Sequence, residues 1–200
     1  MITKHNIYIG ASQRMMQVNN NSVDLVVTSP PYPMIKMWDE VFAEQNTEIA
    51  KALDTDRTKA FRLMHNELDN VWKECFRVLK YGGFICINIG DATRNINNHF
   101  SLYNNHSHVI QSCLDIGFIG LPNIIWRKQT NAPNKFMGSG MLPCGAYVTL
   151  EHEWILIFRK GDKREFKTEE QKLERMKSAY FWEERNIWFS DVWDVKGAKQ

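Results

Sequence analysis

Val23-Asp24-Leu25-Val26-Val27-Thr28-Ser29-Pro30-Pro31-Tyr32 is a β-branched apolar run that ends at two consecutive prolines. Such a run indicates a buried strand, and the prolines end it because they cannot donate to a sheet ladder. Two prolines in succession also fix two φ angles and leave backbone carbonyls free to accept hydrogen bonds. The segment therefore predicts a stiff loop at the carboxyl end of an interior strand.

On both sides of this segment, apolar strands alternate with amphipathic helices. The expected strands are 7–10, 23–28, 84–89, 117–126 and 152–159, and the expected helices are 12–18, 58–79 and 106–116. Nearly continuous apolar strands are typical of parallel sheets that are covered on both faces. The alternation predicts an α/β fold with an open, mostly parallel sheet, helices on both faces, and ligands bound at the carboxyl ends of the strands.

The composition limits the classes of function only loosely. A formal net charge of +2 is too small to indicate nucleic-acid binding, so a DNA interface has to be argued from motifs. The cysteines lack C-x-x-C spacing, and we expect reduced thiols and no metal site. No apolar stretch reaches the roughly 18 residues of a membrane helix, and we therefore expect no membrane partner.

The loop from Ser29 to Tyr32 has the groups needed for chemistry on an amine. The exocyclic amine of a nucleobase is a poor nucleophile, and acceptors aimed at its hydrogens help to position it and to localise its lone pair. The Ser29 hydroxyl and the Pro30 carbonyl are suitable acceptors, while Pro31 stiffens the loop. Tyr32 offers a face for base stacking, worth roughly 1–3 kcal/mol. The alternative is a strand that simply ends at a diproline turn.

The segment from Asp24 to Tyr32 resembles the catalytic segment of the beta-class DNA amino-methyltransferases. Further similar stretches follow in the same order and spacing, and the resemblance extends from about Ile7 to Val195. These stretches are Tyr8-Ile9-Gly10, Arg77-Val78-Leu79-Lys80-Tyr81-Gly82-Gly83, Gly90-Asp91, Trp126-Arg127-Lys128 and His152-Glu153. The resemblance implies a Rossmann-like methyltransferase fold, S-adenosylmethionine as the methyl donor, a flipped base in double-stranded DNA as the substrate, and a restriction-modification role in the prokaryotic cytoplasm.

The resemblance also bears on which base is modified. In this family a serine at the first motif position tends to accompany the N4 amine of cytosine, so Ser29 favours cytosine. An N6-adenine methyltransferase and a non-catalytic DNA-binding subunit of a split enzyme are the alternatives. An RNA or protein amine methyltransferase with a similar loop is a further one. The catalytic residues implied by the resemblance are Ser29, Pro30, Pro31 and Tyr32.

The cofactor side of the reaction is poorly represented in the sequence. The family holds the cofactor with an F-x-G-x-G turn preceded by Asp-Pro, and Phe136-Met137-Gly138-Ser139-Gly140 matches only the letters, because no apolar strand precedes it. The stretch 189–194 is similar to the lead-in to that missing portion. We expect a catalytic region over 1–159, and over 160–200 a charged connector and the start of a further portion. The loop is then supplied by that portion or by a second polypeptide.

Other candidate site residues follow from position and residue type. The cofactor candidates are Gly10, Thr28 and Asp91, and the DNA-binding candidates are Trp38, Arg127, Lys128, Asn131 and Lys135. Many of the latter fall in a predicted long loop, 127–150, whose amide and basic groups suit phosphates and base edges. Asp91 at a strand end and Asp39 just beyond the Ser29–Tyr32 loop are carboxylates at plausible site positions. They can equally be helix or turn caps. Pro143-Cys144 has the form of the nucleophile dipeptide of enzymes that methylate carbon 5 of cytosine, but nothing else supports that chemistry, and we interpret Cys144 as a packed or loop thiol. His152-Glu153 is interpreted as structural, since neighbouring strand residues point to opposite faces.

Overall fold

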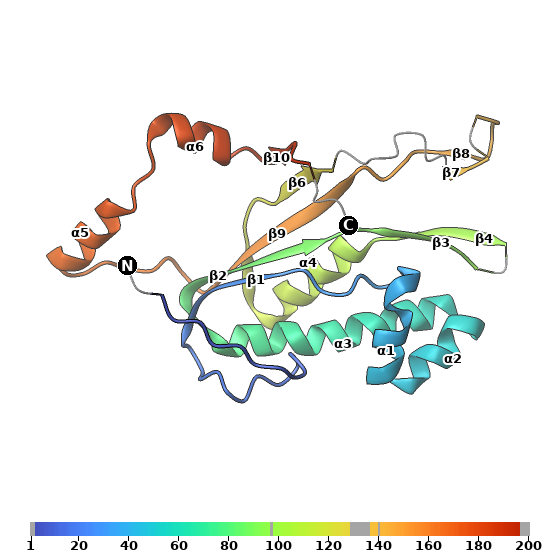
Figure 1. Cartoon of the computed structure of the whole chain (residues 1–200), viewed down its shortest axis with the longest axis horizontal. Helices are drawn as coiled ribbons and strands as arrows, with labels where there is room; N and C mark the ends of the chain where they lie inside the picture. Colours follow the sequence, from blue (N-terminus) through green and yellow to red (C-terminus); the bar gives the residue numbers. More distant parts are fainter. Residues whose placement is uncertain (1–2, 97, 129–136, 140, 197–200) are drawn as a thin grey trace.

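The computed structural model describes residues 3–96, 98–128, 137–139 and 141–196 (Figure 1). The helices are η1 (Lys36–Trp38), α1 (Asp39–Gln45), α2 (Thr47–Thr55), α3 (Arg57–Val78), α4 (Asn105–Ile116), α5 (Glu169–Lys177) and α6 (Trp182–Trp188). The strands are β1 (Val23–Thr28), β2 (Leu79–Ile89), β3 (Ala92–Ile96), β4 (His99–Tyr103), β5 (Phe118–Gly120), β6 (Ile124–Arg127), β7 (Met137–Gly138), β8 (Ala146–Tyr147), β9 (His152–Lys160) and β10 (Val192–Trp193).

The central sheet has six strands in the order β1-β2-β9-β6-β10, with β5 paired to β9 as well. β1 is parallel to β2, and β6 is parallel to β10, whereas β9 is antiparallel to β2, β5 and β6. Among the described strands of this sheet, all except β9 therefore run in one direction. The predicted α/β class with an open, mostly parallel sheet is confirmed, and the carboxyl ends of β1, β2 and β6 lie at the same edge.

One face of the sheet is covered by α3 and α4 (Figure 1). Trp72 of α3 is fully buried, as are Ile85 and Ile87 of β2 and Leu156 of β9. Burying one such side chain contributes roughly 1.5–3 kcal/mol, so this layer carries most of the fold's apolar stabilisation. α3 itself begins at Asp56, whose side chain accepts from the backbone N–H of Lys59, and it ends where Leu79 turns extended.

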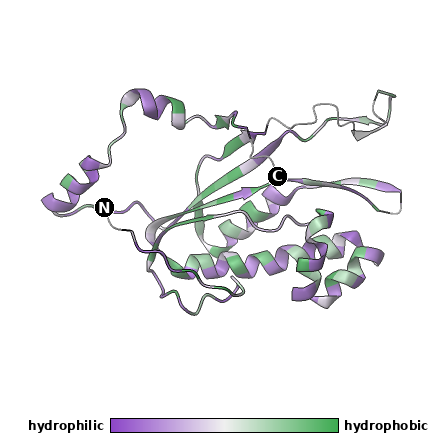
Figure 2. Cartoon of the chain, in the orientation of Figure 1, coloured by the Kyte–Doolittle hydropathy of each residue, from purple (hydrophilic) through white to green (hydrophobic). Residues whose placement is uncertain are grey.

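The opposite face of the sheet is largely apolar and partly exposed. Leu25 and Val27 of β1 are 54% and 73% exposed, and Phe84, which pairs with Leu25, is 39% exposed. Figure 2 shows hydrophobic colour along β2 and β9, whereas α5 is mainly hydrophilic. Among the described residues, helices therefore cover only one face of the sheet. Neither α5 nor α6 contains a buried side chain. The predicted boundary at residue 160 coincides with the end of β9 and stays a prediction.

The N-terminal β-α-β unit predicted for residues 7–28 is wrong in its first two elements. Residues 3–22 contain neither a helix nor a strand, and Ile7 and Ile9 are 89% and 98% exposed. A strand requires a neighbour for its backbone groups, and no described strand lies beside residues 7–9. The Arg77 guanidinium instead binds the carbonyls of Met15 and Val18 and holds this segment on α3 as coil.

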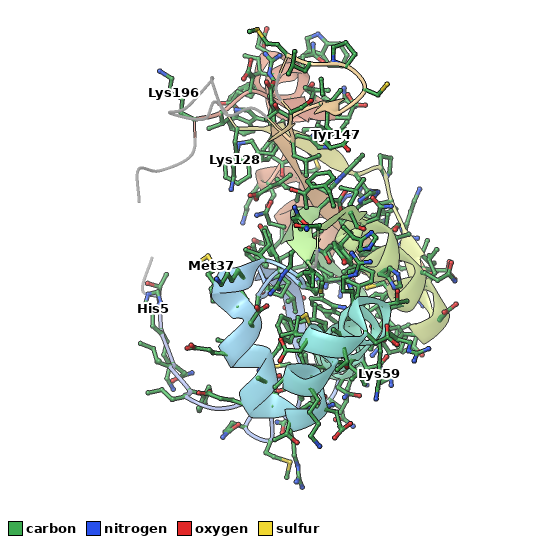
Figure 3. The ribbon with its side chains drawn as sticks, turned by 90° about the vertical axis from the view of Figure 1, so that its right-hand side faces the viewer. His5, Met37, Lys59, Lys128, Tyr147 and Lys196 are labelled. Atoms are coloured by element: carbon green, nitrogen blue, oxygen red, sulfur yellow. The ribbon has the colours of Figure 1, made fainter. Side chains whose placement is uncertain are left out.

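Two hairpins extend from the body of the protein in the same direction (Figure 1). β3 pairs with β4, and β7 pairs with β8, and each pair is a separate two-stranded sheet. The hairpins touch through the rings of Phe100 and Tyr147, which are stacked 4.8 Å apart. Figure 3 shows Tyr147 and Lys128 away from Lys59, which lies among the helices. The predicted loop 127–150 therefore contains a hairpin among its described residues.

Candidate active site

The Ser29–Tyr32 loop follows β1 directly, at the carboxyl edge of the sheet. Thr28 is the last residue of β1 and pairs with Ile87 of β2. Just beyond the loop, Met34 is almost completely buried with a left-handed φ of 66°, and its N–H points to the sulfur of Met64, 3.4 Å away. The loop is thereby anchored in the core under α3. The strand before it is not interior as predicted, because β1 is the edge strand of the described sheet and its only sheet neighbour there is β2.

The hydroxyl group of Tyr32 is the centre of a hydrogen-bond network. Its oxygen donates to Oε2 of Glu153 over 2.9 Å and accepts from Nδ2 of Asn88 over 2.8 Å. Ser29 Oγ lies 3.3 Å away, and because the tyrosine proton is used by Glu153, the serine hydroxyl is the donor in this contact. Burial, with the nearby Glu153 carboxylate adding to it, raises the pKa of Tyr32 well above its ordinary value, so the hydroxyl keeps its proton.

Glu153 belongs to this network, although the sequence suggested only a structural role for it. Its carboxylate also accepts from Asn88 Nδ2 over 2.7 Å and from Lys128 Nζ over 2.5 Å. His152 points to the other face of the sheet, where its ring packs against Trp154. Sequence reasoning missed the role of Glu153, although an ionisable residue at the start of the apolar strand Trp154–Phe158 is a usable signal.

Asn105 is a second residue that sequence reasoning missed. It is completely buried at the start of α4, and its amide donates to the carbonyls of Pro33 and Gly90 over 3.1 and 2.9 Å. Its oxygen lies 3.1 Å from Nε2 of His65, which is the donor because Asn105 offers only an acceptor there. Asn105 therefore ties the residue after the Ser29–Tyr32 loop to the residue after β2. Burial lowers the pKa of His65 to about 3, so the imidazole is neutral.

The acidic candidates are both engaged by neighbouring cations or donors. Asp91 accepts from the backbone N–H of His106 over 3.1 Å and lies 2.7 Å from its Nδ1, which fits a cap at the start of α4. The His106 ring in turn stacks on Trp154. Asp39 forms a two-point ion pair with Arg94 of β3, with distances of 2.8 and 2.6 Å. These contacts hold the β3–β4 hairpin and α4 against the carboxyl edge.

The predicted DNA-binding residues are distributed around the same edge. Lys128 is engaged by Glu153 and lies 4.5 Å from the Trp126 ring centroid, while the exposed Arg127 pairs with Asp194. Trp38 is half-buried and packs against the core. Asn131 and Lys135 lie outside the described residues. No group of three or more potential metal ligands occurs among the residues that the structure covers.

The candidates for cofactor binding are not brought together. Gly10 lies in exposed coil with no atom within 4 Å of an added Cβ, whereas Thr28 and Asp91 lie at the carboxyl edge. Phe136 and Gly140 are outside the described residues, and Met137–Gly138 pairs with β8 away from the main sheet. Within 3–96, 98–128, 137–139 and 141–196, Ser29, Tyr32, Asn88 and Glu153 are brought together, whereas Gly10 lies apart from Thr28 and Asp91.

The sheet order and the Ser-Pro-Pro-Tyr loop at its carboxyl edge define the class as a Rossmann-like methyltransferase fold. A model of the N6/N4 DNA methylase family matches residues 23–200, and the chain belongs to this family of DNA methylases. No helix that the structure describes is both long and apolar enough to span a membrane.

Two relatives from archaea match nearly all of the chain. The Type II methyltransferase M.MthZI of Methanothermobacter thermautotrophicus is 55% identical over 100% of this chain and 57% of its own length. M.MjaI of Methanocaldococcus jannaschii is 50% identical over 99% of this chain and 69% of its own length. The chain thus spans between about half and about two thirds of these relatives.

Two solved structures share the fold. TTHA0409 of Thermus thermophilus, a putative DNA modification methylase solved with S-adenosyl-L-methionine, superposes with a TM-score of 0.69 at 29% identity, covering 93% of this chain and 66% of that one. The PvuII DNA methyltransferase, described as cytosine-N4-specific, has a TM-score of 0.57 at 14% identity and covers 96% and 57%. At that identity the second likeness concerns the fold alone.

Proposed function

We propose that this protein transfers a methyl group to the exocyclic N4 amine of a flipped cytosine in double-stranded DNA, as part of a prokaryotic, cytoplasmic restriction-modification system. The observation that carries the proposal is the orientation of Ser29. Its hydroxyl proton is directed to Tyr32, so its lone pairs remain to accept a hydrogen from an incoming amine. Membership of the DNA methylase family supports the reaction type.

The chain's own groups account for the handling of the base. A base in a duplex is out of reach and has to be extruded before its amine meets the loop. Tyr32 then offers a stacking face, and Ser29 Oγ and the Pro30 carbonyl accept the two amine hydrogens, which orients the nitrogen lone pair. After transfer, the nitrogen carries an extra substituent and loses one of these hydrogens as a proton. Pro30 and Pro31 keep the acceptors from shifting.

The choice of cytosine over adenine rests on Ser29. A neutral hydroxyl at this position accompanies the cytosine N4 amine in the family that the sequence resembles, whereas a carboxylate or an amide accompanies the adenine N6 amine. N6-adenine methylation is the alternative, and it requires the same base flipping and the same acceptors. The second alternative is that the protein is a non-catalytic DNA-binding subunit. It is considered because the described residues do not bring the candidates for cofactor binding together.

S-adenosylmethionine is the proposed methyl donor, and it supplies an electrophilic methyl group on a sulfonium. The bound S-adenosyl-L-methionine of TTHA0409, which is 29% identical, supports this choice. Thr28 and Asp91 at the carboxyl edge are the remaining candidate contacts from this chain. We propose that the main cofactor loop comes from residues other than the described ones, either in a longer protein or in a second polypeptide.

The proposed DNA contacts are Arg127, Lys128, Asn131, Lys135 and Trp38. Arg127 is exposed beside the site, so it suits a phosphate once Asp194 is displaced. The β3–β4 and β7–β8 hairpins extend from the same edge and are the proposed surface along which the duplex lies. The recognition sequence depends on base contacts that these elements would make.

The proposal is tested by incorporation of a tritiated methyl group into duplex DNA, with the chain alone and with a polypeptide that carries Asp-Pro-Phe-x-Gly-x-Gly. Ser29→Ala is expected to lower the rate by about 10²–10³-fold, since a preorganised polar contact to the reacting group is lost. Ser178→Ala, an exposed serine on the far C-terminal segment, is the matched control and should leave the rate unchanged. Equal incorporation by Ser29→Ala and the wild type would refute the proposed role of the loop.

A further inference from the structure

Glu153 is a partly buried carboxylate that faces the catalytic loop from the start of β9. Only 17% of its side chain is exposed, and the donors to it come from three different parts of the chain. Tyr32 donates from the loop after β1, Asn88 from β2, and Lys128 from the residue after β6. A carboxylate of this kind costs free energy to bury, so three charge-assisted contacts are needed to hold it.

In this network only Glu153 accepts the hydrogen of the Tyr32 hydroxyl. Glu153 is therefore the one acceptor that can set the orientation of Tyr32. The hydroxyl has a single hydrogen, and Glu153 receives it, while Asn88 and Ser29 donate to the same oxygen. Both amide hydrogens of Asn88 are committed to Tyr32 and Glu153, and among the described residues no donor reaches its Oδ1. The amide therefore takes its orientation from the carboxylate.

One edge of the Tyr32 ring, formed by Cδ2 and Cε2, packs closely against Gly90. A Cβ added at Gly90 would lie 3.0 Å from Cε2 of the ring and 3.3 Å from Cγ of Glu153. A larger residue at this position would push the ring aside by a few tenths of an ångström, because real Cβ atoms rarely approach so closely. The ring is thus fixed along one edge by backbone and at its tip by the hydroxyl contacts.

Lys128 has a specific place in this arrangement. A carboxylate beside a polyanionic substrate would repel it, and the Lys128 ammonium, 2.5 Å from Oε1, compensates the charge. The same contact leaves Oε2 to Tyr32 and Asn88. Lys128 is therefore engaged within the protein, and a direct contact with DNA would require it to share or leave the Glu153 carboxylate.

We propose that Glu153 is the positioning residue of the site: it fixes the Tyr32 ring in the orientation that stacks the flipped base, with Lys128 neutralising its charge. The proposal rests on the proposed function, since it concerns the base that Tyr32 receives. It assigns to Glu153 a role in the rate of methyl transfer and a much smaller role in overall DNA affinity.

The first test compares Glu153→Gln with Glu151→Gln in the preparation that methylates DNA. Glu151 is an exposed carboxylate two positions away, so it controls for a general loss of negative charge. We expect Glu153→Gln to lower kcat by about 10–100-fold with KM for DNA changed less than about threefold, because a small misplacement of a reacting group is costly. A kcat within about twofold of the wild type would overturn the proposal, since the same principle requires a larger loss.

The second test asks whether Glu153 acts through Tyr32. Tyr32→Phe keeps the stacking face but removes the hydroxyl, so it should lower kcat to a similar extent as Glu153→Gln. In the double variant the two losses are expected to overlap rather than multiply. If Glu153→Gln lowers kcat as much in the Tyr32→Phe background as in the wild type, Glu153 works by some other route and the proposal is wrong.

Two measurements separate folding and general inactivity from the proposed effect. If Glu153→Gln does not fold, as judged by circular dichroism, Glu153→Asp replaces it in the same cycle, because the shorter side chain keeps the charge but withdraws the carboxylate from Tyr32. Fluorescence of 2-aminopurine at the target position should show a less stacked base in either variant, and an unchanged signal would count against the proposal. If the wild-type preparation never methylates DNA, the proposed function fails first.

Discussion

The carboxyl edge of the sheet and the C-terminal segment after Lys160 differ in how their polar and apolar groups are satisfied. At the edge, Tyr32, Asn88 and Glu153 bond one another, and Asn105 is completely buried with each of its contacts made to another element. In the C-terminal segment, Phe181 and Trp182 are 74% and 70% exposed. The edge is fixed by long-range contacts, whereas the segment is held mainly by its neighbours in sequence.

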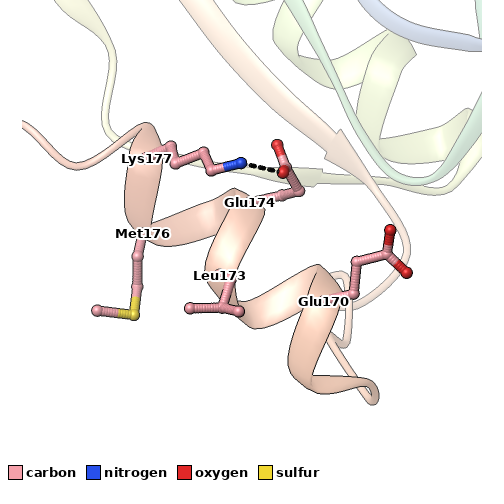
Figure 4. A pocket seen from close by; sticks show the side chains of 5 residues that line it. All are labelled: Glu170, Leu173, Glu174, Met176 and Lys177. Atoms are coloured by element: carbon pink, nitrogen blue, oxygen red, sulfur yellow. Dashed lines mark hydrogen bonds and ion pairs between the residues drawn. The ribbon is translucent and has the colours of Figure 1, made fainter.

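The helix α5 shows the same contrast at close range. Figure 4 shows Leu173 and Met176 along a shallow groove with Glu170 and the Glu174–Lys177 pair, all from this one helix. α5 is stabilised by a capping box at Thr168 and by i,i+3 ion pairs. Each ion pair contributes only about a few tenths of a kcal/mol. The contacts of α5 in this groove are local, whereas those at the edge join residues far apart in the sequence.

The largest expected effect is the loss of the Asn105 side chain. Asn105→Ala leaves the Pro33 carbonyl, the Gly90 carbonyl and the His65 N–H without their partner in a buried site, at a cost of about 3 kcal/mol or more of unfolding free energy. Urea unfolding followed by circular dichroism measures it. Asn104→Ala, its exposed neighbour, is the control, and an equal loss in both variants would remove the distinction between the two regions.

A pH dependence beneath the site should be nearly as large. His65 is neutral when folded because burial lowers its pKa to about 3, below the ordinary value of about 6.5 of an unfolded histidine. The contribution of the neutral imidazole to the free energy of unfolding is fully present above about pH 6.5 and is lost as the pH falls toward about 3. At about pH 4.5 the loss is on the order of 2–3 kcal/mol. The free energies of unfolding of the wild type and His65→Gln, measured as a function of pH, should converge as the pH is lowered. If their difference stays constant with pH, the assignment of His65 as a neutral residue in the folded state is wrong.

Lys160, at the junction of the two regions, should have an intermediate effect. Its ammonium group donates to the carbonyls of Phe76 and Leu79 and to the side chain of Asn21, and it is almost completely buried. Lys160→Met removes these contacts at the end of α3, and we expect a loss of about 2 kcal/mol. The exposed Lys163→Met is the matched control in thermal melts. If Lys160→Met leaves the melting temperature unchanged, β9 and α3 are joined by packing alone.

The smallest effect is expected in the C-terminal segment. Trp182→Ser removes a large side chain that is 70% exposed, so unfolding free energy should change by less than about 0.5 kcal/mol. Differential scanning calorimetry of this chain is the measurement. A loss above about 2 kcal/mol, which is typical of a buried site, would mean that α6 is packed as firmly as the edge, and the comparison would no longer hold.

The sequence predicted the elements whose signals are local. β1, α3, β2 and β9 were found because apolar periodicity and prolines act over a few residues. The strand at 7–10 was predicted wrongly, because its pattern says nothing about the absence of a neighbouring strand. The β3–β4 hairpin was missed because Thr93-Arg94-Asn95 lacks an apolar alternation. The helix layer on the second face was expected, but the described residues leave that face exposed.

The candidate site was predictable only in part, for the same reason. The Ser29–Tyr32 loop is one contiguous motif, so the sequence placed it at the carboxyl end of a strand. Glu153 lies 121 positions from Tyr32, and Asn105 lies 72 positions from Pro33. Contacts at such separations depend on strand order and register, which a single sequence does not specify. The cofactor and DNA assignments remain proposals.

The central claim is that the Ser29–Tyr32 loop methylates an exocyclic amine of cytosine in DNA. Mass spectrometry of nucleosides from duplex DNA treated with the chain, S-adenosylmethionine and a polypeptide carrying the cofactor loop tests it most directly. We expect N4-methylcytosine with the wild type and a strongly reduced amount with Ser29→Ala. N6-methyladenine alone would correct the base, and 5-methylcytosine, or no methylated nucleoside in any combination, would contradict the claim.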